Sequence, residues 1–451
     1  MSAPYDVVIV GAGPAGIFAA LELTRLGNAS VCVLEKGPDL PERMGKGNNS
    51  MLSGWGGAGA YSDGKLALSP DLGGSLDQYL SHGNLVALVT YVDDTYRSFG
   101  AGGEVHGDDP ERVGRIVRQA ARFDLRLVPG RYRHLGTDGC RELLGKLRAH
   151  LGSRVETRCA APVKQVLTSA EGARGVVLED GTEVRGRFVI LAPGREGSAW
   201  LAGEAGRLEL HTTVNPVDIG VRVEVPAAVT EDLTGALYEA KLLYTTRHFE
   251  DAVRTFCMCP YGEVIREDLG GLFTVNGHSY ASRRTANTNF ALLVSTTFTE
   301  PFKEPITYGR SVARLANLLA GQVLVQRLGD LRAGRRSTPG RIAKGLVEPT
   351  LADATPGDLS FALPYRHLAG ILEMLEALDN LAPGVNSRHT LLYGVEVKFY
   401  SLRLSLTAAL ETEVPGLFAV GDGAGVSRGL VQASGSGIVA AREVARRLAG
   451  R

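Results

Sequence analysis

Three glycines near the N-terminus carry the clearest chemical signal in the chain. Gly11, Gly13 and Gly16 give the spacing G-x-G-x-x-G, with Pro14 and Ala15 before the last glycine. Gly11 permits a tight turn, Gly13 lets a phosphate approach the backbone, and Gly16 lets a helix pack closely on a strand. The N–H groups at the start of the following helix would face the phosphates. This spacing predicts a site for the pyrophosphate of a dinucleotide.

The elements around the motif are those that such a site requires. Residues 5–10 form a short apolar run typical of a strand buried in a parallel sheet. A helical pattern then continues to Leu26, and a second strand covers residues 30–34. Glu35 and Lys36 follow that strand directly. A carboxylate at this position accepts hydrogen bonds from an adenosine ribose and repels a 2′-phosphate, so NADP is disfavoured while FAD and NAD both stay open.

A segment near the C-terminus favours FAD over NAD. Residues 414–425 read as a turn, a buried strand and the pair Gly421-Asp422, which resembles the second FAD signature of the glutathione-reductase superfamily. In that signature the aspartate holds a ribityl hydroxyl, so Asp422 is the candidate here. A helix to about Leu448 follows, and its positive end would stabilise charge on the flavin. The residues that open this helix are Gly429, Leu430 and Val431.

Two further segments are predicted to contact the cofactor. Residues 188–195 resemble an internal strand-to-glycine turn of the same superfamily, with Ala192 and Gly194 at the turn. Residues 54–66 hold five glycines, which suits a loop pressed against a ring system or a pyrophosphate. The predicted contacts in this loop are Gly57, Gly59, Ala60, Ser62 and Asp63. Just upstream, Arg43 is placed either to pair with the diphosphate or to remain solvated.

Candidates for catalysis are few, because the flavin carries the hydride and the chain has to supply a proton donor or acceptor. Cys257 and Cys259 alternate within a predicted strand, so both thiols would point to one face, as a redox-active pair or, more commonly, as small core residues. His278 is a candidate acid or base, although a structural histidine is the more usual case. Tyr400 and Lys398 are expected to line the flavin pocket.

Arginine is concentrated between residues 327 and 344, against a single acid, Asp330. Such a stretch would steer an anionic substrate or NADPH, although a solvated loop is the more usual explanation.

Composition excludes several other classes of protein. Lys and Arg number 49, as do Asp and Glu, so the overall charge does not favour nucleic acid or an anionic membrane as a partner. Five cysteines without C-x-x-C spacing predict neither a disulfide scaffold nor a zinc site. The sequence has no apolar stretch long enough to span a bilayer and begins without a signal-peptide pattern. A cytoplasmic location is therefore expected.

The motifs predict an α/β protein with a Rossmann-like FAD-binding domain, which combines a parallel sheet with a β meander and is discontinuous in sequence. We assign residues 1–208 and 387–451 to this domain and residues 209–386 to an inserted α+β substrate or cap domain. The meander is expected over residues 155–189, where Val163 would offer its backbone to the adenine. The insert is expected to contain strands at Asp218–Val225, Leu272–Asn276 and Phe290–Phe298 and helices near 310–328 and 366–380.

Over nearly its full length the chain resembles a bacterial and archaeal family of uncharacterised FAD-dependent dehydrogenases. The motifs that carry the resemblance span residues 57–66, 134–138, 254–260, 275–279, 326–330 and 394–396. The chain departs from the family pattern at Tyr261, at Asp422 and over residues 397–401. The resemblance implies an oxidoreductase with non-covalent FAD and a small-molecule substrate.

The leading hypothesis for function is a dehydrogenase or reductase that moves a hydride between FAD and an organic substrate. NAD(P)H or an electron-carrier protein would be the transient electron donor. One alternative is an NAD(P)H-dependent flavin monooxygenase, whose usual Asp-Gly motif is not evident around residues 193–195. Another is a non-catalytic binding protein that FAD stabilises. No second G-x-G-x-x-G follows a strand in the middle of the chain, which disfavours a disulfide reductase.

Overall fold

The computed structural model describes residues 3–43, 53–61, 64–213, 215–280, 283–299, 301–302, 304–400 and 402–450. The chain divides into two compact units. The first comprises Met1–Glu104, Arg133–Val214 and Ser401–Arg451, and the second comprises Val105–Tyr132 and Asn215–Tyr400.

The first unit combines a sheet with several helices. Its strands are β1 (Tyr5–Val10), β2 (Val31–Leu34), β3 (Lys65–Ala67), β7 (Glu156–Arg158), β8 (Val163–Ser169), β9 (Gly172–Leu178), β10 (Glu183–Leu191), β11 (Thr212–Thr213), β21 (Arg403–Leu404) and β22 (Leu417–Ala419), while β6 (Tyr132–His134) begins at the boundary between the units. Its helices are α1 (Pro14–Leu26), α2 (Leu40–Arg43), α3 (His82–Ser98), α5 (Gly136–Leu151), α6 (Ser198–Arg207) and α12 (Leu430–Ala449), with short 3-10 turns at Gly57–Tyr61 and Leu76–Gln78.

The main sheet of this unit is parallel around β1. Its order is β7-β2-β1-β10, and β22 pairs with the C-terminal half of β10. The N-terminal half of β10 pairs instead with β9, which pairs with β8, and both pairings are antiparallel. The structure thus confirms the predicted parallel sheet and the β meander.

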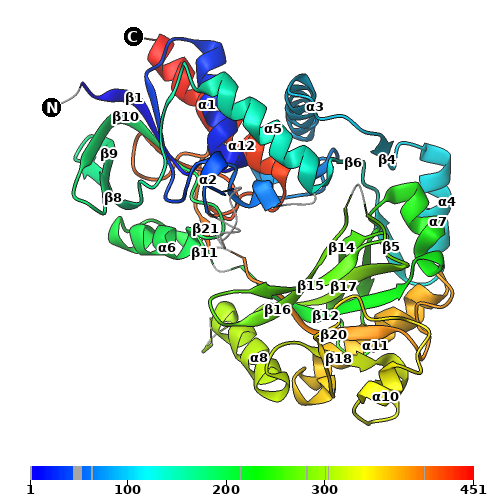
Figure 1. Cartoon of the computed structure of the whole chain (residues 1–451). Coiled ribbons are helices and arrows are strands. Elements are labelled where there is room, and N and C mark those ends of the chain that lie inside the picture. The colour runs from blue at the N-terminus through cyan, green and yellow to red at the C-terminus, as the bar shows by residue number, and fades with distance from the viewer. Residues whose placement is uncertain are drawn as a thin grey trace. The chain divides into compact units, whose positions relative to one another are not determined.

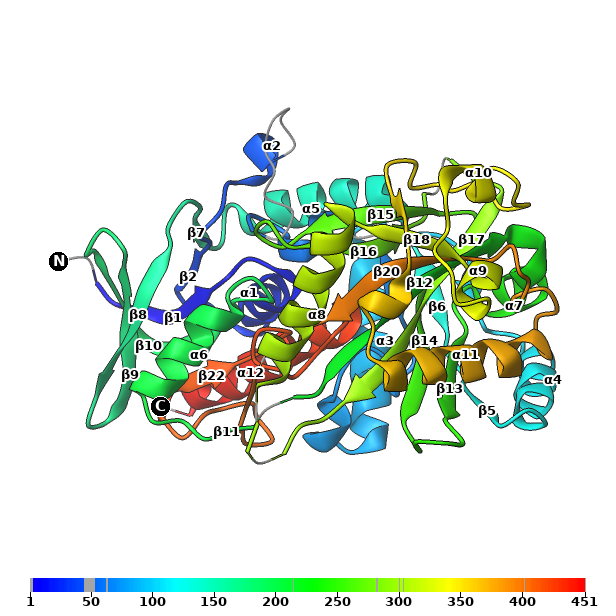
Figure 2. The same ribbon diagram turned by 90° about the horizontal axis from the view of Figure 1, so that it is seen from below.

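Helices α1 and α12 lie side by side, as Figures 1 and 2 both show. They pack closely because Gly437 of α12 faces the backbone of α1: a Cβ atom at this position would lie 2.0 Å from the carbonyl oxygen of Ala15. Residues from the two ends of the chain therefore share one hydrophobic core, with Ile17 and Phe18 on α1 and Ile438 on α12.

The second unit is built on one large sheet. Its strands are β4 (Val105–His106), β5 (Leu125–Val128), β12 (Val217–Pro226), β13 (Lys241–Thr245), β14 (Ala252–Cys259), β15 (Glu263–Asp268), β16 (Phe273–His278), β17 (Asn287–Thr296), β18 (Leu324–Arg327), β19 (Thr355–Pro356) and β20 (Leu391–Lys398). Its helices are α4 (Pro110–Ala121), α7 (Ala227–Leu237), α8 (Pro305–Ala320), α9 (Leu328–Arg332), α10 (Pro339–Ile342) and α11 (Tyr365–Asp379), with a short 3-10 turn at Leu359–Phe361.

The sheet has the order β19-β18-β20-β12-β17-β14-β13-β5. The residues of β12 alternate between its two faces. Val217, Ile219 and Val221 belong to a hydrophobic core that also contains residues of α8 and α11. Figure 2 shows α11 running along this sheet. The opposite face of β12 carries Asp218 and Arg222, and the β15–β16 hairpin contacts this strand and its neighbours.

The predicted helix over residues 310–328 is wrong in its second half. Helix α8 ends at Ala320 because Gly321 adopts a left-handed φ of 74° and donates its N–H to the carbonyl of Asn317 at 2.7 Å. Residues Leu324–Arg327 then form a buried strand that pairs with β20. The segment that was expected to form one helix is thus divided between a helix and a strand.

Candidate functional site

Four parallel strands of the first unit end at the same edge of the sheet. Gly11 follows β1, Glu35 follows β2, Ala192 follows β10, and Gly421 comes two residues after β22. Backbone hydrogen bonds continue past the strand ends, since the N–H of Gly11 donates to the carbonyl of Leu34 at 2.7 Å. Ligands of open α/β sheets bind outside the carboxyl ends of the strands. The register therefore brings together segments from three distant parts of the chain where such a ligand would lie.

The glycines of G-x-G-x-x-G have different surroundings. A Cβ atom on Gly11, whose φ is 105°, would lie 2.1 Å from the carbonyl oxygen of Ala192. A Cβ atom on Gly16 would lie 1.9 Å from the carbonyl oxygen of Gly11. The fold therefore requires glycine at both positions. At Gly13, by contrast, a Cβ atom would meet only the Cα of Gly57, at 3.9 Å, so the backbone there borders open space.

The start of α1 fits a diphosphate. Gly13 occupies the capping position and provides no side chain to cap the helix. Pro14 has no N–H group, and the N–H groups of Ala15 and Gly16 have no acceptor within the helix. Both residues are buried, so these donors need a partner that approaches the helix end. A phosphate group meets that need.

Glu35 is almost fully buried beside this turn, with 6% of its surface exposed. Its Oε2 accepts the N–H of Ala12 at 2.8 Å, and its Oε1 accepts the N–H groups of Gly37 and Gly54, each at 2.9 Å. One carboxylate thus fixes three backbone segments. Oε2 retains capacity for a second donor such as a ribose hydroxyl. Lys36 lies on the surface, with its Nζ 3.4 Å from Oε1 of Glu196.

The glycine-rich loop packs directly on the dinucleotide motif. Gly56 donates its N–H to the carbonyl of Ala12 at 2.8 Å, and the short 3-10 turn that contains Gly57, Gly59 and Ala60 follows. The side chain of Trp55, in the same loop, is completely buried. Two of the predicted cofactor contacts, Ser62 and Asp63, lie outside the described residues.

Arg43 is not a solvated side chain, since only 1% of its surface is exposed. Its Nη1 donates to the carbonyl oxygens of Gly54 and Trp55, at 3.1 and 2.7 Å. The guanidinium thus holds the glycine-rich loop in place, a role that the sequence did not suggest. Its predicted pairing with a diphosphate stays a prediction.

The C-terminal segment supplies an acidic side chain at the sheet edge. Oδ2 of Asp422 accepts a hydrogen bond from Nε of Arg195 at 2.9 Å, and the two side chains are 25% and 49% exposed. Gly421, at a φ of 76°, donates its N–H to Oγ of Ser436 at 2.9 Å. Ser436 therefore positions the Gly-Asp pair from within α12, and the sequence analysis missed it. Gly194 completes the neighbouring turn with a φ of 63°.

Helix α12 also begins without a capping side chain, which leaves the N–H groups of its first turn, at Leu430 and Val431, without helical acceptors. The N–H of Gly429 itself donates to the carbonyl of Gly73 at 2.9 Å. Gln432, which is 1% exposed, anchors this turn. Its Oε1 accepts the N–H of Leu76 at 3.1 Å, and its Nε2 donates to two carbonyl oxygens of residues 70–72. No motif in the sequence indicated this role for Gln432.

Val163 lies at the start of β8, where it pairs with Leu178 of β9. The connection from β7 to this strand reaches the nucleotide end of the sheet, because the N–H of Ala161 donates to the backbone carbonyl of Glu35 at 2.9 Å. Contact between Val163 and an adenine stays a prediction.

The second unit contains a buried ion pair on the polar face of its sheet. Arg222 and Glu396 are both fully buried, and Nη1 of Arg222 lies 3.3 Å from each oxygen of Glu396. Arg222 also donates through Nε to Oδ1 of Asn289 at 2.8 Å. On the other side of the pair, Nζ of Lys398 lies 3.0 Å from Oε1 of Glu396. Opposite charges and hydrogen bonds together compensate the desolvation of these groups.

The two predicted redox cysteines adjoin this ion pair. Nη2 of Arg222 donates to the carbonyl oxygen of Cys257 at 2.6 Å and to Sγ of Cys259 at 3.4 Å. The expected alternation along the strand is wrong here. The register with β17 shifts between Phe256 and Cys259, and Cys257 adopts a left-handed φ of 46°. This bulge removes the regular two-residue period on which the expectation of a shared face depended.

Tyr400 belongs to a second polar group at the end of β20. Its hydroxyl donates to Oδ2 of Asp218 at 2.5 Å and accepts from Nη2 of Arg254 at 2.7 Å. Arg254 also donates to Asp218 at 2.6 Å. Burial disfavours the charged form of Asp218, but the Arg254 charge and the Tyr400 hydrogen bond outweigh it and lower the pKa of the Asp218 carboxyl. The phenol is thus held between an anion and a cation.

The structure places His278 at the end of β16, opposite Glu263 of β15. Its ring lies 6.4 Å from that of Tyr280 in an edge-to-face arrangement. The predicted catalytic residues therefore occupy different elements: the cysteines adjoin Arg222, Tyr400 adjoins Asp218, and His278 is on the hairpin.

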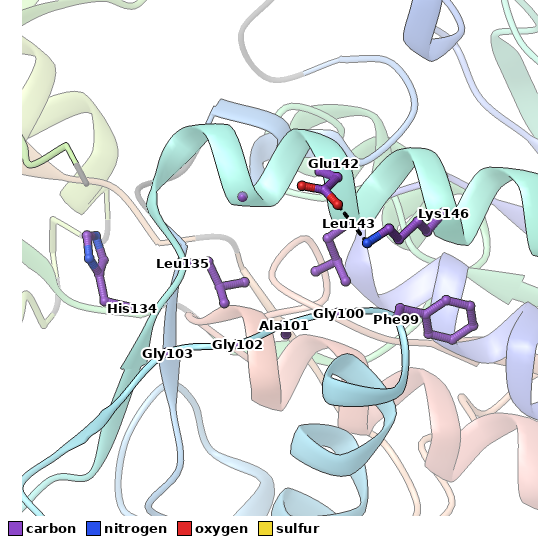
Figure 3. A pocket seen from close by; sticks show the side chains of 11 residues that line it. Phe99, Gly100, Ala101, Gly102, Gly103, His134, Leu135, Glu142, Leu143 and Lys146 are labelled. Atoms are coloured by element: carbon purple, nitrogen blue, oxygen red, sulfur yellow. Dashed lines mark ion pairs between the residues drawn. The ribbon is translucent and has the colours of Figure 1, made fainter. Parts of the chain in front are cut away.

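A cavity of about 250 Å³ lies elsewhere in the first unit, between α5 and residues 99–103. Figure 3 shows Glu142 and Lys146 on α5 next to this cavity. Oε1 of Glu142 and Nζ of Lys146 are 2.7 Å apart. None of the residues that line it belongs to the predicted FAD contacts. In the part of the chain that the structure describes, no cluster of side chains is suited to bind a metal ion. Nor is any described helix long and apolar enough to cross a membrane.

Comparison with known proteins identifies the family. The model of the family described as FAD dependent oxidoreductase matches residues 6–266, more than half of the chain. A model described as FAD-dependent protein, C-terminal domain-like, matches residues 216–399, and one described as glucose inhibited division protein A matches residues 352–451. The chain therefore belongs to the FAD dependent oxidoreductase family. It is an enzyme that uses FAD as its cofactor.

Two relatives illustrate the range of similarity. An uncharacterized protein of Clostridium beijerinckii is 27% identical over 97% of this chain and 80% of its own length. The mitochondrial electron transfer flavoprotein-ubiquinone oxidoreductase of Oryza sativa is 51% identical over 49 residues, which are 10% of this chain and 8% of that protein. Among solved structures, a geranylgeranyl bacteriochlorophyll reductase-like protein of Thermoplasma acidophilum aligns with a TM-score of 0.44 at 13% identity, covering 99% of this chain and 79% of that one.

Proposed function

We propose that the enzyme moves a hydride between N5 of FAD and an organic substrate, with FAD held by the first unit and the substrate by the second. The observation that carries the assignment of the FAD site is the convergence of Gly11, Glu35, Ala192 and Gly421 at the ends of four parallel strands. When bound, the isoalloxazine ring supplies the two-electron chemistry. The chain has to bind it, orient it and manage protons.

The binding roles follow from the contacts of the site. The uncapped first turn of α1 would hold the diphosphate through the N–H groups of Ala15 and Gly16. Glu35 would accept a ribose hydroxyl, and Asp422 a ribityl hydroxyl. The first turn of α12 would place its positive end near the ring and favour the flavin in its anionic reduced form.

Tyr400 is the side chain that we propose as the proton donor or acceptor. Its hydroxyl is already engaged in short hydrogen bonds with Asp218 and Arg254. After the phenol gives its proton to a substrate, the guanidinium of Arg254 would stabilise the phenolate. The Asp218 carboxylate would hold both side chains in this orientation.

The experiment that tests the function follows the flavin absorbance of the yellow holoenzyme without oxygen, after separate additions of NADH and NADPH. Bleaching by a nucleotide alone supports a reductase whose flavin is reduced by a soluble hydride donor. Bleaching that needs an added organic substrate as well, followed on admission of oxygen by insertion of one oxygen atom into that substrate, overturns the proposal in favour of a monooxygenase. A flavin that neither nucleotide bleaches, but that an organic substrate bleaches, supports a dehydrogenase that its substrate reduces.

The role of Tyr400 is tested with the reductant found in that experiment. Tyr400→Phe should slow flavin reduction by about 100-fold, in the range usual for loss of an acid-base group, and should remove one limb of its pH profile. Tyr365→Phe is the matched control, because that side chain is 75% exposed in the same unit. An unchanged pH profile in Tyr400→Phe would rule out the proton-transfer role.

A further inference from the structure

The arginine-rich stretch of the second unit folds around one buried carboxylate. Asp330 is fully buried, and its Oδ1 lies 3.0 Å from Nε of Arg335 and 4.0 Å from Nε of Arg341. Its Oδ2 accepts a hydrogen bond from Oγ of Ser337 at 2.8 Å and lies 3.3 Å from Nε of Arg327. Three guanidinium groups thus share a single negative charge.

Three further cations belong to the same stretch or adjoin it. Arg336, Lys344 and Arg388 are exposed, and none of them forms an ion pair within the described residues. Arg388 is adjacent because its Cβ would lie 2.7 Å from a Cβ atom on Gly329, the neighbour of Asp330. The Asp330 cluster is defined here as Asp330 with Arg327, Arg335, Arg336, Arg341, Lys344 and Arg388.

A buried donor next to the Asp330 cluster lacks an acceptor. Nε of Arg388 donates to Nε2 of His389 at 3.1 Å, so the neutral imidazole carries its proton on Nδ1. That Nδ1 is buried and finds no hydrogen-bond acceptor among the described residues. Buried donors without acceptors are uncommon in folded proteins, and this one belongs to a ring that contacts Arg388.

We propose that the Asp330 cluster binds a phosphate-bearing small ligand at a site distinct from the FAD site. Guanidinium groups bind phosphate oxygens through paired N–H donors, which suits a site made mainly of arginine. A compact ligand fits better than a nucleic acid, because the charge is confined to one loop region of a chain with 49 residues of each sign. The phosphate would come either from inorganic pyrophosphate or from a nucleotide. This inference goes beyond the proposed hydride transfer and does not depend on it.

The test is calorimetric titration of FAD-saturated holoenzyme at low salt with sodium pyrophosphate, with adenosine 2′,5′-bisphosphate and with adenosine. Both phosphate compounds should bind while adenosine does not, and the visible flavin spectrum should stay unchanged. Tighter binding of the bisphosphate would identify a nucleotide as the source, and tighter binding of pyrophosphate an inorganic ligand. The variant Arg336→Gln/Lys344→Gln/Arg388→Gln should weaken binding by about tenfold or more, since a single charge-assisted hydrogen bond contributes on that order.

The matched control is Arg115→Gln/Arg118→Gln/Arg314→Gln, which removes the same charge from exposed positions of α4 and α8. Its affinity should equal that of the unmodified protein. An equal loss of affinity in both variants would mean that binding depends only on the overall charge of the protein, and this would overturn the proposal. The absence of binding by the unmodified protein would overturn it as well. If a labelled oligonucleotide binds more tightly than both phosphate compounds, and only the cluster variant loses this binding, the proposal is wrong and the cluster is a nucleic-acid-binding surface.

Discussion

The substitution Gly13→Ala separates binding of FAD from folding of the chain. In the structure a Cβ atom on Gly13 would meet only the Cα of Gly57, at an ordinary contact distance of 3.9 Å, and the φ of −79° suits alanine. The methyl group would occupy the space through which a diphosphate reaches the N–H groups of Ala15 and Gly16. Losing these two charge-assisted hydrogen bonds should cost about 3–6 kcal/mol, which weakens FAD binding by roughly 100-fold to 10,000-fold.

FAD affinity is measured by titrating apoprotein with FAD and following quenching of flavin fluorescence, and folding by urea denaturation of the apoprotein. Gly13→Ala should unfold at the same urea concentration as the unmodified apoprotein. Gly16→Ala should instead destabilise the apoprotein, because its Cβ atom would lie 1.9 Å from the carbonyl oxygen of Gly11. Gly83→Ala, where a Cβ atom meets nothing within 4 Å, is the neutral control. If Gly13→Ala binds FAD as tightly as the unmodified chain, the diphosphate does not lie at this turn.

Three other predictions follow from single side chains. Asp422→Ala should weaken FAD binding by about tenfold in the same titration. It should lower the free energy of unfolding of the apoprotein by less than about 1 kcal/mol, because the ion pair of Asp422 with Arg195 is partly exposed. A larger loss of stability would mean that this ion pair is structural. Arg222→Met should lower the free energy of unfolding by about 3–5 kcal/mol, because it removes the guanidinium that contacts both oxygens of the buried Glu396 carboxylate and leaves it only Lys398 as a cationic partner. The substitution Arg247→Met, at an exposed side chain, should change it little, and equal urea midpoints for the two variants would contradict this prediction. Burial lowers the pKa of His367 to about 4. Between about pH 6.5 and pH 4 the imidazole is therefore protonated in the unfolded chain but stays neutral in the folded chain. The free energy of unfolding should fall by up to about 3 kcal/mol as the pH drops from 6.5 to 4. His367→Gln should remove that part of the pH dependence of urea unfolding, and a variant with an unaltered dependence would show that another group is responsible.

The FAD-binding fold was predictable because its signals are contiguous. The strand at residues 5–10, the glycine turn and the helix to Leu26 follow one another directly, and the structure has them within one residue of the predicted positions. Local spacing is sufficient there because each element is fixed by its own period and its own glycines. The contacts that this segment makes with FAD stay predictions.

Elements of the second unit were predicted less well where neighbours decide the outcome. Residues 324–327 belong to the stretch that was expected to be helical, but they form a strand because β20 offers a pairing edge. Cys257 departs from strand alternation because a bulge shifts its register against β17. Neither a pairing edge nor a bulge leaves a periodic signal in the sequence.

The sequence by itself determined the cofactor class, since the residues expected to bind the dinucleotide occupy short motifs whose spacing has a direct physical meaning. Only the tertiary structure decided which polar side chains meet in the second unit. Arg222 and Glu396 are separated by 174 residues, and Asp218 and Tyr400 by 182. These pairs form because β12 and β20 lie side by side in a particular register. The register depends on the packing of whole strands, which no local pattern of residues encodes.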